Sequence, residues 1–132
     1  MVPIQVPSAP WLVLALTGVA LLCFGAACAL WPSRMAAMTE LSLPTPTART
    51  DFAATYGGFQ IGFAVFLLAC TRSPGWMEPG LWAGASASAG FAGMRTVGIV
   101  LSRGRVNAVT WLALGMELAG LVLNAWALGQ LR

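Results

Sequence analysis

Hydrophobic residues fall in long blocks along this chain, separated by short polar connections. The four longest blocks cover about residues 11–31, 51–71, 80–102 and 107–129. Each is close to the length of about 20 apolar residues that an α-helix needs to cross a bilayer core. A transmembrane barrel would instead show short segments of alternating apolar and polar residues. The pattern predicts an all-α fold, an integral membrane bundle of four transmembrane helices that forms a single domain over residues 1–132.

The ends of the first block carry interfacial signals. Pro10 and Pro32 bracket it, and Trp11 and Trp31 lie where an aromatic belt would meet the membrane surface. A cleaved signal peptide is the rival interpretation, because residues 27–29 read Ala-Cys-Ala and resemble a small-residue cleavage site. However, the leading segment has no Lys or Arg, and the apolar stretch is longer than a signal peptide uses. We therefore expect this block to be a transmembrane helix.

The first connection is predicted to contain a short amphipathic helix. Residues 33–40 hold methionines and alanines that could face lipid, with Ser33 as the N-cap. Two prolines within residues 43–47 cannot continue that helix. Asp51 and Asn107 are the predicted N-caps of the second and fourth transmembrane helices. The remaining connections are short, so consecutive helices should pack antiparallel as neighbours.

The composition agrees with a membrane location. The chain is 58% hydrophobic and 8% charged, with a mean hydropathy of +0.79, whereas soluble domains carry about 25% charged residues. Its net charge of +3 comes from seven arginines, which are scattered singly and mostly near block ends. This is a topology pattern and not the clustered basic surface of a nucleic-acid-binding protein. We expect the lipid bilayer as a partner and no nucleic acid.

The arginines also predict an orientation. Four crossings place both chain ends on one side of the membrane. The arginines outside the blocks divide four to two: Arg34, Arg49, Arg103 and Arg105 beside the first and third connections, Arg72 and Arg132 on the side of the termini. The positive-inside rule then favours cytoplasmic connections and non-cytoplasmic termini. Because arginine without lysine is compatible with a GC-rich bacterial genome, we expect a bacterial inner membrane.

The absence of histidine excludes several chemistries. Haem ligation by His, a His-based zinc site and a Ser-His-Asp triad are all ruled out. Three cysteines lie inside apolar blocks and form no Cys-x-x-Cys pair, so we interpret them as small buried hydrophobic residues. We predict no catalytic residue, no metal site and no cofactor.

Two charged residues, Arg95 and Glu117, stand well inside the predicted spans. A charge at such a position costs about 2.5 to 3.5 kcal/mol on insertion scales, so each is a candidate for a role. At 1.5 Å per residue, Arg95 lies roughly 10 Å before the third connection and Glu117 roughly 16 Å beyond it. An arginine side chain can bridge that offset. An Arg95–Glu117 ion pair between adjacent antiparallel helices is therefore predicted.

Further polar residues extend this pair into a predicted cluster. Tyr56 and Gln60, four residues apart on the second helix, reach a similar depth. Heptad spacing continues the polar faces of the last two helices: Ser88, Arg95 and Ser102 on the third, Thr110, Glu117 and Asn124 on the fourth. We predict a half-buried cavity lined by Arg95, Glu117, Tyr56 and Gln60, with Arg49 and Asp51 at its mouth. The cluster is either an internal network that fixes helix register or a site for a ligand, proton or ion.

Small residues form a second pattern. Gly58 and Gly62 in the second helix, and Gly80 and Gly84 in the third, have the Gly-x-x-x-Gly spacing. Glycines one turn apart let two helix backbones approach closely. These faces are predicted to meet another helix, either inside the bundle or in a partner subunit or second copy of the chain.

A family resemblance rests on three features: Arg49-x-Asp51 followed by Tyr56-Gly57-Gly58-x-x-x-Gly62, then Arg95-x-x-Gly98, then Glu117. With these, the chain resembles a family of uncharacterised bacterial four-helix membrane proteins, distantly grouped with the DoxX-like proteins. The resemblance covers nearly the whole chain. It departs at Arg103-Gly104, where the family often has an acidic residue before glycine. The resemblance implies the fold and a membrane location but no reaction, because the family is a domain of unknown function.

Three functions remain open. The first is a non-catalytic membrane protein that binds a partner subunit or a lipid-like molecule, with Arg95 and Glu117 as the central pair. The second is a small proton- or ion-coupled transporter or permeation unit in which Glu117 exchanges the ion. The third is an accessory subunit of a quinone-linked oxidoreductase, a role that some DoxX-like relatives have. Only the third function makes the chain part of an enzyme. The chain itself lacks a haem ligand or dithiol for electron transfer, so such a role would be accessory.

Overall fold

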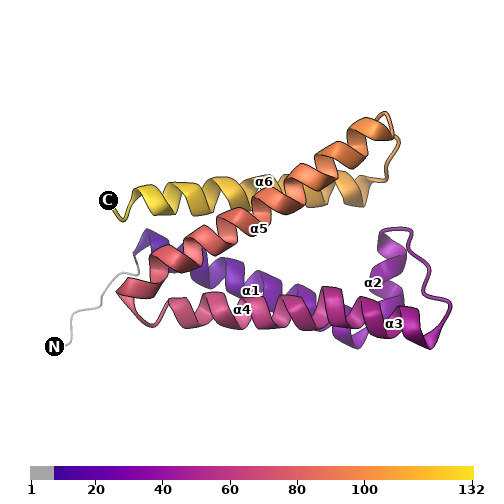
Figure 1. Cartoon of the computed structure of the whole chain (residues 1–132), viewed down its shortest axis with the longest axis horizontal. Helices are drawn as coiled ribbons and strands as arrows, with labels where there is room; N and C mark the ends of the chain where they lie inside the picture. Colours follow the sequence, from indigo (N-terminus) through magenta and orange to yellow (C-terminus); the bar gives the residue numbers. More distant parts are fainter. Residues whose placement is uncertain (1–7) are drawn as a thin grey trace.

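A computed structural model describes residues 8–132, and this part of the chain is entirely helical outside its turns and connections (Figure 1). Residues 1–7, which belong to the leading segment without Lys or Arg, lie outside the described part of the chain. The elements follow in this order: α1 (Ala9–Leu30), α2 (Pro32–Met38), α3 (Pro46–Phe52), the π-helical segment η1 (Ala53–Gly58), α4 (Phe59–Cys70), α5 (Pro74–Leu101) and α6 (Ala108–Gly129). The segments α3, η1 and α4 form one continuous helix. The prediction of an all-α fold is confirmed.

The long helices pair as two antiparallel hairpins. α1 packs along η1 and α4, while α5 packs along α6. α5 starts beside the end of α4 and diverges from it toward its own C-terminus, as Figure 1 shows. The start of α1, the α4–α5 turn and the C-terminus share one end of the molecule, and α2, α3 and the α5–α6 turn share the other. Two hydrogen bonds tie the latter end together, from Asn107 Nδ2 to Met38 O and to Glu40 Oε1, both at 3.3 Å.

Three helical stretches are long and apolar enough to cross a membrane: Ala9–Leu30, Pro46–Cys70 and Ala108–Gly129. The prediction of four spans is therefore met only in part. α5 is the longest helix, with 28 residues, but it does not reach the same hydropathy. Its sequence dilutes the apolar residues with Glu78, Pro79, Arg95 and several glycines and serines.

Two of the predicted N-caps are wrong, because a proline starts each helix elsewhere. Proline is favoured in the first helical turn, where it needs no N–H partner and its φ is already helical. The second long helix begins at Pro46, and its N-cap Thr45 accepts a hydrogen bond from Ala48 N at 3.1 Å. Asp51 consequently lies inside that helix on its exposed side. In the first connection the short helix is present, but it begins at Pro32, so Ser33 is not its cap.

A proline in the first turn also sets the start of α5. The helix begins at Pro74, with Ser73 at the N-cap position, and not at the predicted Gly80. Pro79 then lies inside the helix near its start, where it removes one backbone hydrogen bond. The predicted cap of the last helix is confirmed, because Asn107 Oδ1 accepts from Thr110 N at 2.9 Å.

Buried apolar side chains form a cluster at each end of the molecule. The larger one joins α1, α4, α5 and α6 near the α4–α5 turn: Val13, Leu14, Leu67, Cys70, Leu81 and Ala127. The smaller one joins α1, α2 and α3 at the opposite end: Cys28, Ala36 and Phe52. Burial of Cys28 and Cys70 agrees with their interpretation as core residues, whereas Cys23 is exposed on the outside of α1.

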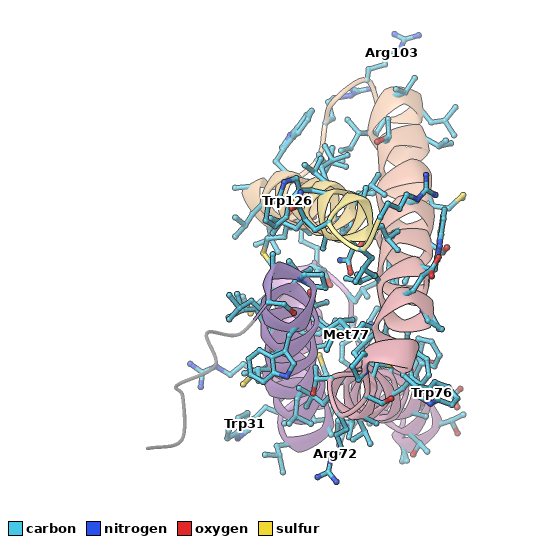
Figure 2. All side chains as sticks on the ribbon, turned by 90° about the vertical axis from the view of Figure 1, so that its left-hand side faces the viewer. Trp31, Arg72, Trp76, Met77, Arg103 and Trp126 are labelled. Carbon is cyan, nitrogen blue, oxygen red and sulfur yellow. The ribbon has the colours of Figure 1, made fainter. Side chains whose placement is uncertain are left out.

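Large apolar side chains also cover the outside of the long helices. Leu16 on α1, Val65 on α4, Leu101 on α5 and Leu112 on α6 are all exposed. Figure 2 shows side chains projecting from the helices in all lateral directions. A water-soluble bundle would place polar residues there. This exterior suits the hydrocarbon of a membrane or the surface of a partner protein.

Candidate ligand-binding site

Arg95 on α5 and Glu117 on α6 form a two-pronged ion pair. Arg95 Nε donates to both carboxylate oxygens, at 3.1 Å to Oε1 and 2.9 Å to Oε2, and Arg95 Nη2 donates to Oε1 at 2.7 Å. The predicted ion pair is therefore present. The side chains keep 29% and 16% of their surfaces exposed. Arg95 Nη1 makes no hydrogen bond to a described residue, so the guanidinium presents free N–H donors beside a neutralised charge.

Two more residues of the predicted stripe lie in the α5–α6 contact, whereas the hydroxyls of Ser102 and Thr110 bond locally, to Ile99 O and Asn107 Oδ1. Ser88 and Asn124 both approach glycines of the opposite helix: a Cβ built on Gly120 would lie 2.9 Å from Ser88 Oγ, and one on Gly84 would lie 2.6 Å from Asn124 Oδ1. Asn124 is fully buried, and its Nδ2 donates to Gly120 O at 2.8 Å. Its Oδ1 has no hydrogen-bond partner within residues 8–132. The polar stripe is thus the interface that holds the hairpin together.

Tyr56 belongs to the π-helical segment η1. Its ring stacks on Phe52 with centroids 4.7 Å apart, and 39% of its surface is exposed. Its hydroxyl makes no hydrogen bond to Arg95 or Glu117. Single π-helical turns occur frequently at functional sites because they re-aim side chains. The part of Tyr56 in a site beside Arg95 stays a prediction.

Gln60 does not join the pair by a hydrogen bond. It is buried against α1, where a Cβ added to Gly25 would meet the Gln60 Cβ at 3.0 Å. Its Oε1 is buried without a partner among the described residues. The prediction that Gln60 lines the same site follows from helical spacing alone, but the close contact between α1 and α4 turns this residue toward α1. The hydrogen-bonded part of the predicted cluster is reduced to Arg95 and Glu117.

The two residues expected at the cavity mouth, Arg49 and Asp51, are exposed on α3. Arg49 Nε donates to Leu43 O at 3.4 Å, within the first connection. Neither residue contacts the ion pair through a hydrogen bond in the described structure. Their part in a site stays a prediction.

Of the four predicted packing glycines, two contact other helices closely and two do not. Gly80 and Gly84 pack inside the molecule, with a Cβ on Gly80 reaching to 2.9 Å from Cys70 Cβ. Gly62 has open space around it, and a Cβ on Gly58 would meet only its own helix at 4.0 Å. The close approach of α1 to η1 and α4 uses Gly57 instead, together with two glycines of α1 that the motif search missed, Gly18 and Gly25. Their seven-residue spacing is the signal that could have found them.

An open, shallow groove lies on the outside of α5, over residues 86–94 that directly precede Arg95. Its volume is about 390 Å³, and it is lined by Ser86, Ala87, Gly90, Phe91 and Met94. The lining is almost entirely apolar, so the groove suits a hydrocarbon chain. Within residues 8–132, no three His, Cys, Asp or Glu side chains come together to hold a metal ion.

Three helices that can span a membrane, an apolar exterior and a charged pair between two helices define an integral membrane protein. The chain belongs to the family described as domain of unknown function DUF4345, whose family model matches residues 11–128. No curated protein and no solved structure matches it significantly.

Proposed function

We propose that this protein is a non-catalytic membrane protein that binds an amphipathic, lipid-like molecule beside Arg95. The observation that carries the proposal is the hydrogen bonding of the guanidinium. Glu117 holds Nε and Nη2, while Nη1 has no partner within residues 8–132 and the side chain remains 29% exposed. An unpaired N–H donor in hydrocarbon costs several kcal/mol. A ligand oxygen at Nη1 removes that cost.

The ion pair also defines the ligand's polar end. Because Glu117 neutralises Arg95, the pair attracts no free anion strongly. It offers fixed N–H donors to a carbonyl, ester or hydroxyl oxygen. The Tyr56 hydroxyl can donate to or accept from the same head group. The apolar groove at residues 86–94 then receives the ligand's hydrocarbon chain.

The proposal includes α5 as a fourth transmembrane helix. At 1.5 Å per residue its 28 residues extend over about 42 Å, more than the roughly 30 Å of a hydrocarbon core. α5 packs antiparallel along α6, which is a candidate span, so a membrane-crossing α6 carries α5 with it. Pairing Arg95 with Glu117 lowers the cost of the one arginine inside α5.

The proposed orientation has both termini on the non-cytoplasmic side of a bacterial inner membrane. The hydrogen bonds of Asn107 to Met38 and Glu40 support the grouping of the first and third connections at one end. Four arginines lie in or beside these connections, which the positive-inside rule assigns to the cytoplasm. We also propose that the family is distantly related to the DoxX-like proteins.

Photo-crosslinking tests the ligand site. The full chain, in vesicles, is exposed to a monoacylglycerol with a diazirine in its acyl chain, and the labelled residues are mapped by peptide mass spectrometry. Labelling is expected at residues 86–94. Gly90→Leu fills the groove and should reduce labelling there at least fivefold. Gly115→Leu is the matched control, because Gly115 also has open space but lies on α6 away from this groove.

The double variant Arg95→Leu/Glu117→Leu removes the polar end without leaving a lone charge. It should also lose labelling at residues 86–94 while remaining folded. Unchanged labelling in both Gly90→Leu and this double variant would sink the proposal.

A partner subunit is the second candidate ligand, and a specific observation favours it. Gly58 and Gly62 present a Gly-x-x-x-Gly face that no other described helix covers, flanked by the exposed Phe59 and Phe66. Such a face lets another transmembrane helix approach closely. Gly62→Leu should then lower the apparent mass of the native complex in mild detergent, whereas Gly98→Leu should not.

A further inference from the structure

A second groove lies on the outside of the α4–α5 turn, away from the ion pair. Its volume is about 340 Å³, and six residues line it: Phe66, Ala69, Cys70, Arg72, Ser73 and Trp76. The exposed lining is almost entirely apolar, and the polar atoms of its residues contribute little of it. Arg72 and Ser73 follow directly after the end of α4, so their polar groups stand at that edge of the groove.

Three residues of the lining that follow α4 carry side-chain donors without partners within residues 8–132. Arg72 is exposed and forms no ion pair there. Ser73 occupies the N-cap position of α5, but its hydroxyl makes no capping hydrogen bond. Trp76 is exposed and carries an indole N–H. Glu78, the nearest acidic residue in sequence, does not line the groove.

The position of these donors matches the surface of a bilayer. Arg72 follows the apolar helix that ends at Cys70, and Trp76 belongs to the residue type that concentrates at membrane interfaces. Figure 2, a view from the end that carries the α4–α5 turn, shows Arg72 and Trp76 pointing sideways away from the bundle, whereas Met77 points inward. Sideways is the direction in which neighbouring lipid head groups lie.

We infer that this groove binds an anionic phospholipid. The phosphate accepts hydrogen bonds from the Arg72 guanidinium and the Ser73 hydroxyl, and one acyl chain lies against Phe66 and Ala69. Charge complementarity selects the anionic class, because Arg72 is a cation with no carboxylate in the groove to neutralise it. This site is separate from the one beside Arg95 and does not depend on it.

Native mass spectrometry of the full chain in a non-ionic detergent tests this inference. Phosphatidylglycerol is titrated against phosphatidylcholine of the same acyl chains. The expected result is preferential binding of phosphatidylglycerol, with Arg72→Ala weakening it roughly tenfold, as loss of one charge-assisted hydrogen bond predicts. Arg132→Ala is the matched control, since it removes the same charge at the same end of the molecule outside the groove, and it should change the affinity less than twofold.

Two further variants address the alternatives. Ser73→Ala/Trp76→Phe keeps the charge and should still weaken phosphatidylglycerol binding, by roughly threefold. Inorganic phosphate at millimolar concentration should not displace the lipid, because it cannot occupy the apolar half of the groove. The inference is overturned if Arg72→Ala and Arg132→Ala have equal effects, if both lipids bind alike, or if inorganic phosphate competes.

Discussion

The Arg95–Glu117 pair shows how much a single contact explains in a chain with so few charges. Glu117 lies in a candidate membrane span, where an isolated charge is costly, and Arg95 of the neighbouring α5 neutralises it through three hydrogen-bond contacts. Nη1 of the guanidinium nevertheless makes no hydrogen bond to any residue that the structure describes. A pair that served stability alone would need no unpaired donor at Nη1, whereas a ligand oxygen could accept a hydrogen bond from it.

A double-mutant cycle measures the contribution of the pair to stability. Arg95→Met, Glu117→Gln and the double variant are compared with wild type by thermal unfolding in detergent. We expect each single variant to destabilise the protein and the two to couple by about 1 kcal/mol, the size of interhelical hydrogen bonds in membranes. A coupling near zero would show that the pair does not hold the hairpin, and that its ordered geometry serves another purpose.

Gly84 provides a second test at this scale. A methyl group there would lie 2.6 Å from the buried Asn124 Oδ1, and Asn124 is fixed by its bond to Gly120 O. Gly84→Ala should therefore destabilise the protein by about 1 to 3 kcal/mol. Gly98→Ala, in open space on the same helix, should be neutral or slightly stabilising. Equal melting temperatures for the two variants would contradict the tight α5–α6 contact.

At the scale of elements, proline placement and capping decide where the helices begin. Pro46 and Pro74 start their helices about five residues before the predicted positions, because each occupies the first turn behind a Thr or Ser. The earlier start of α3 adds a turn and a half to the second long helix and changes the role of Asp51. Tyr56 lies in the π-helical segment rather than in a regular helix.

Asn107 and Asp51 can be compared directly, since both are predicted caps and only one is a cap. Asn107→Ala removes the acceptor for Thr110 N and the bonds to Met38 and Glu40, so it should cost about 1 kcal/mol of unfolding free energy. Asp51→Ala should change it by less than about 0.5 kcal/mol, because Asp51 is an exposed interior position. Thermal unfolding of the two variants decides whether the helix start lies at Pro46.

At the scale of the whole molecule, the two hairpins are joined mainly at the α4–α5 end. The larger core cluster lies there, whereas α5 diverges from α4 toward the opposite end. The half of α5 and α6 that carries the ion pair is therefore the less covered part of the molecule. This arrangement leaves Arg95 accessible from the side.

Topology mapping checks the four-span arrangement. Single cysteines at Ser73 and Arg103, in a background with the native cysteines replaced by alanine, are labelled with a membrane-impermeant maleimide in intact cells and in lysed membranes. We expect Ser73→Cys to react in intact cells and Arg103→Cys only after lysis, because α5 crosses between them. Labelling of both from one side would show that α5 does not cross, while reversed labelling would invert the orientation alone.

The sequence by itself determined the helical class, the apolar exterior and the Arg95–Glu117 pair. These features follow from the length of the hydrophobic blocks and from the cost of an unpaired charge in hydrocarbon. Both can be read from neighbouring residues along the chain. Only the tertiary structure decided that Gln60 turns to α1, that Gly57, Gly18 and Gly25 form the close contact, and that Gly62 stays open. The reason is that helical spacing shows which residues share a face, whereas the rotation of each helix against its neighbours depends on packing along the whole length of both helices.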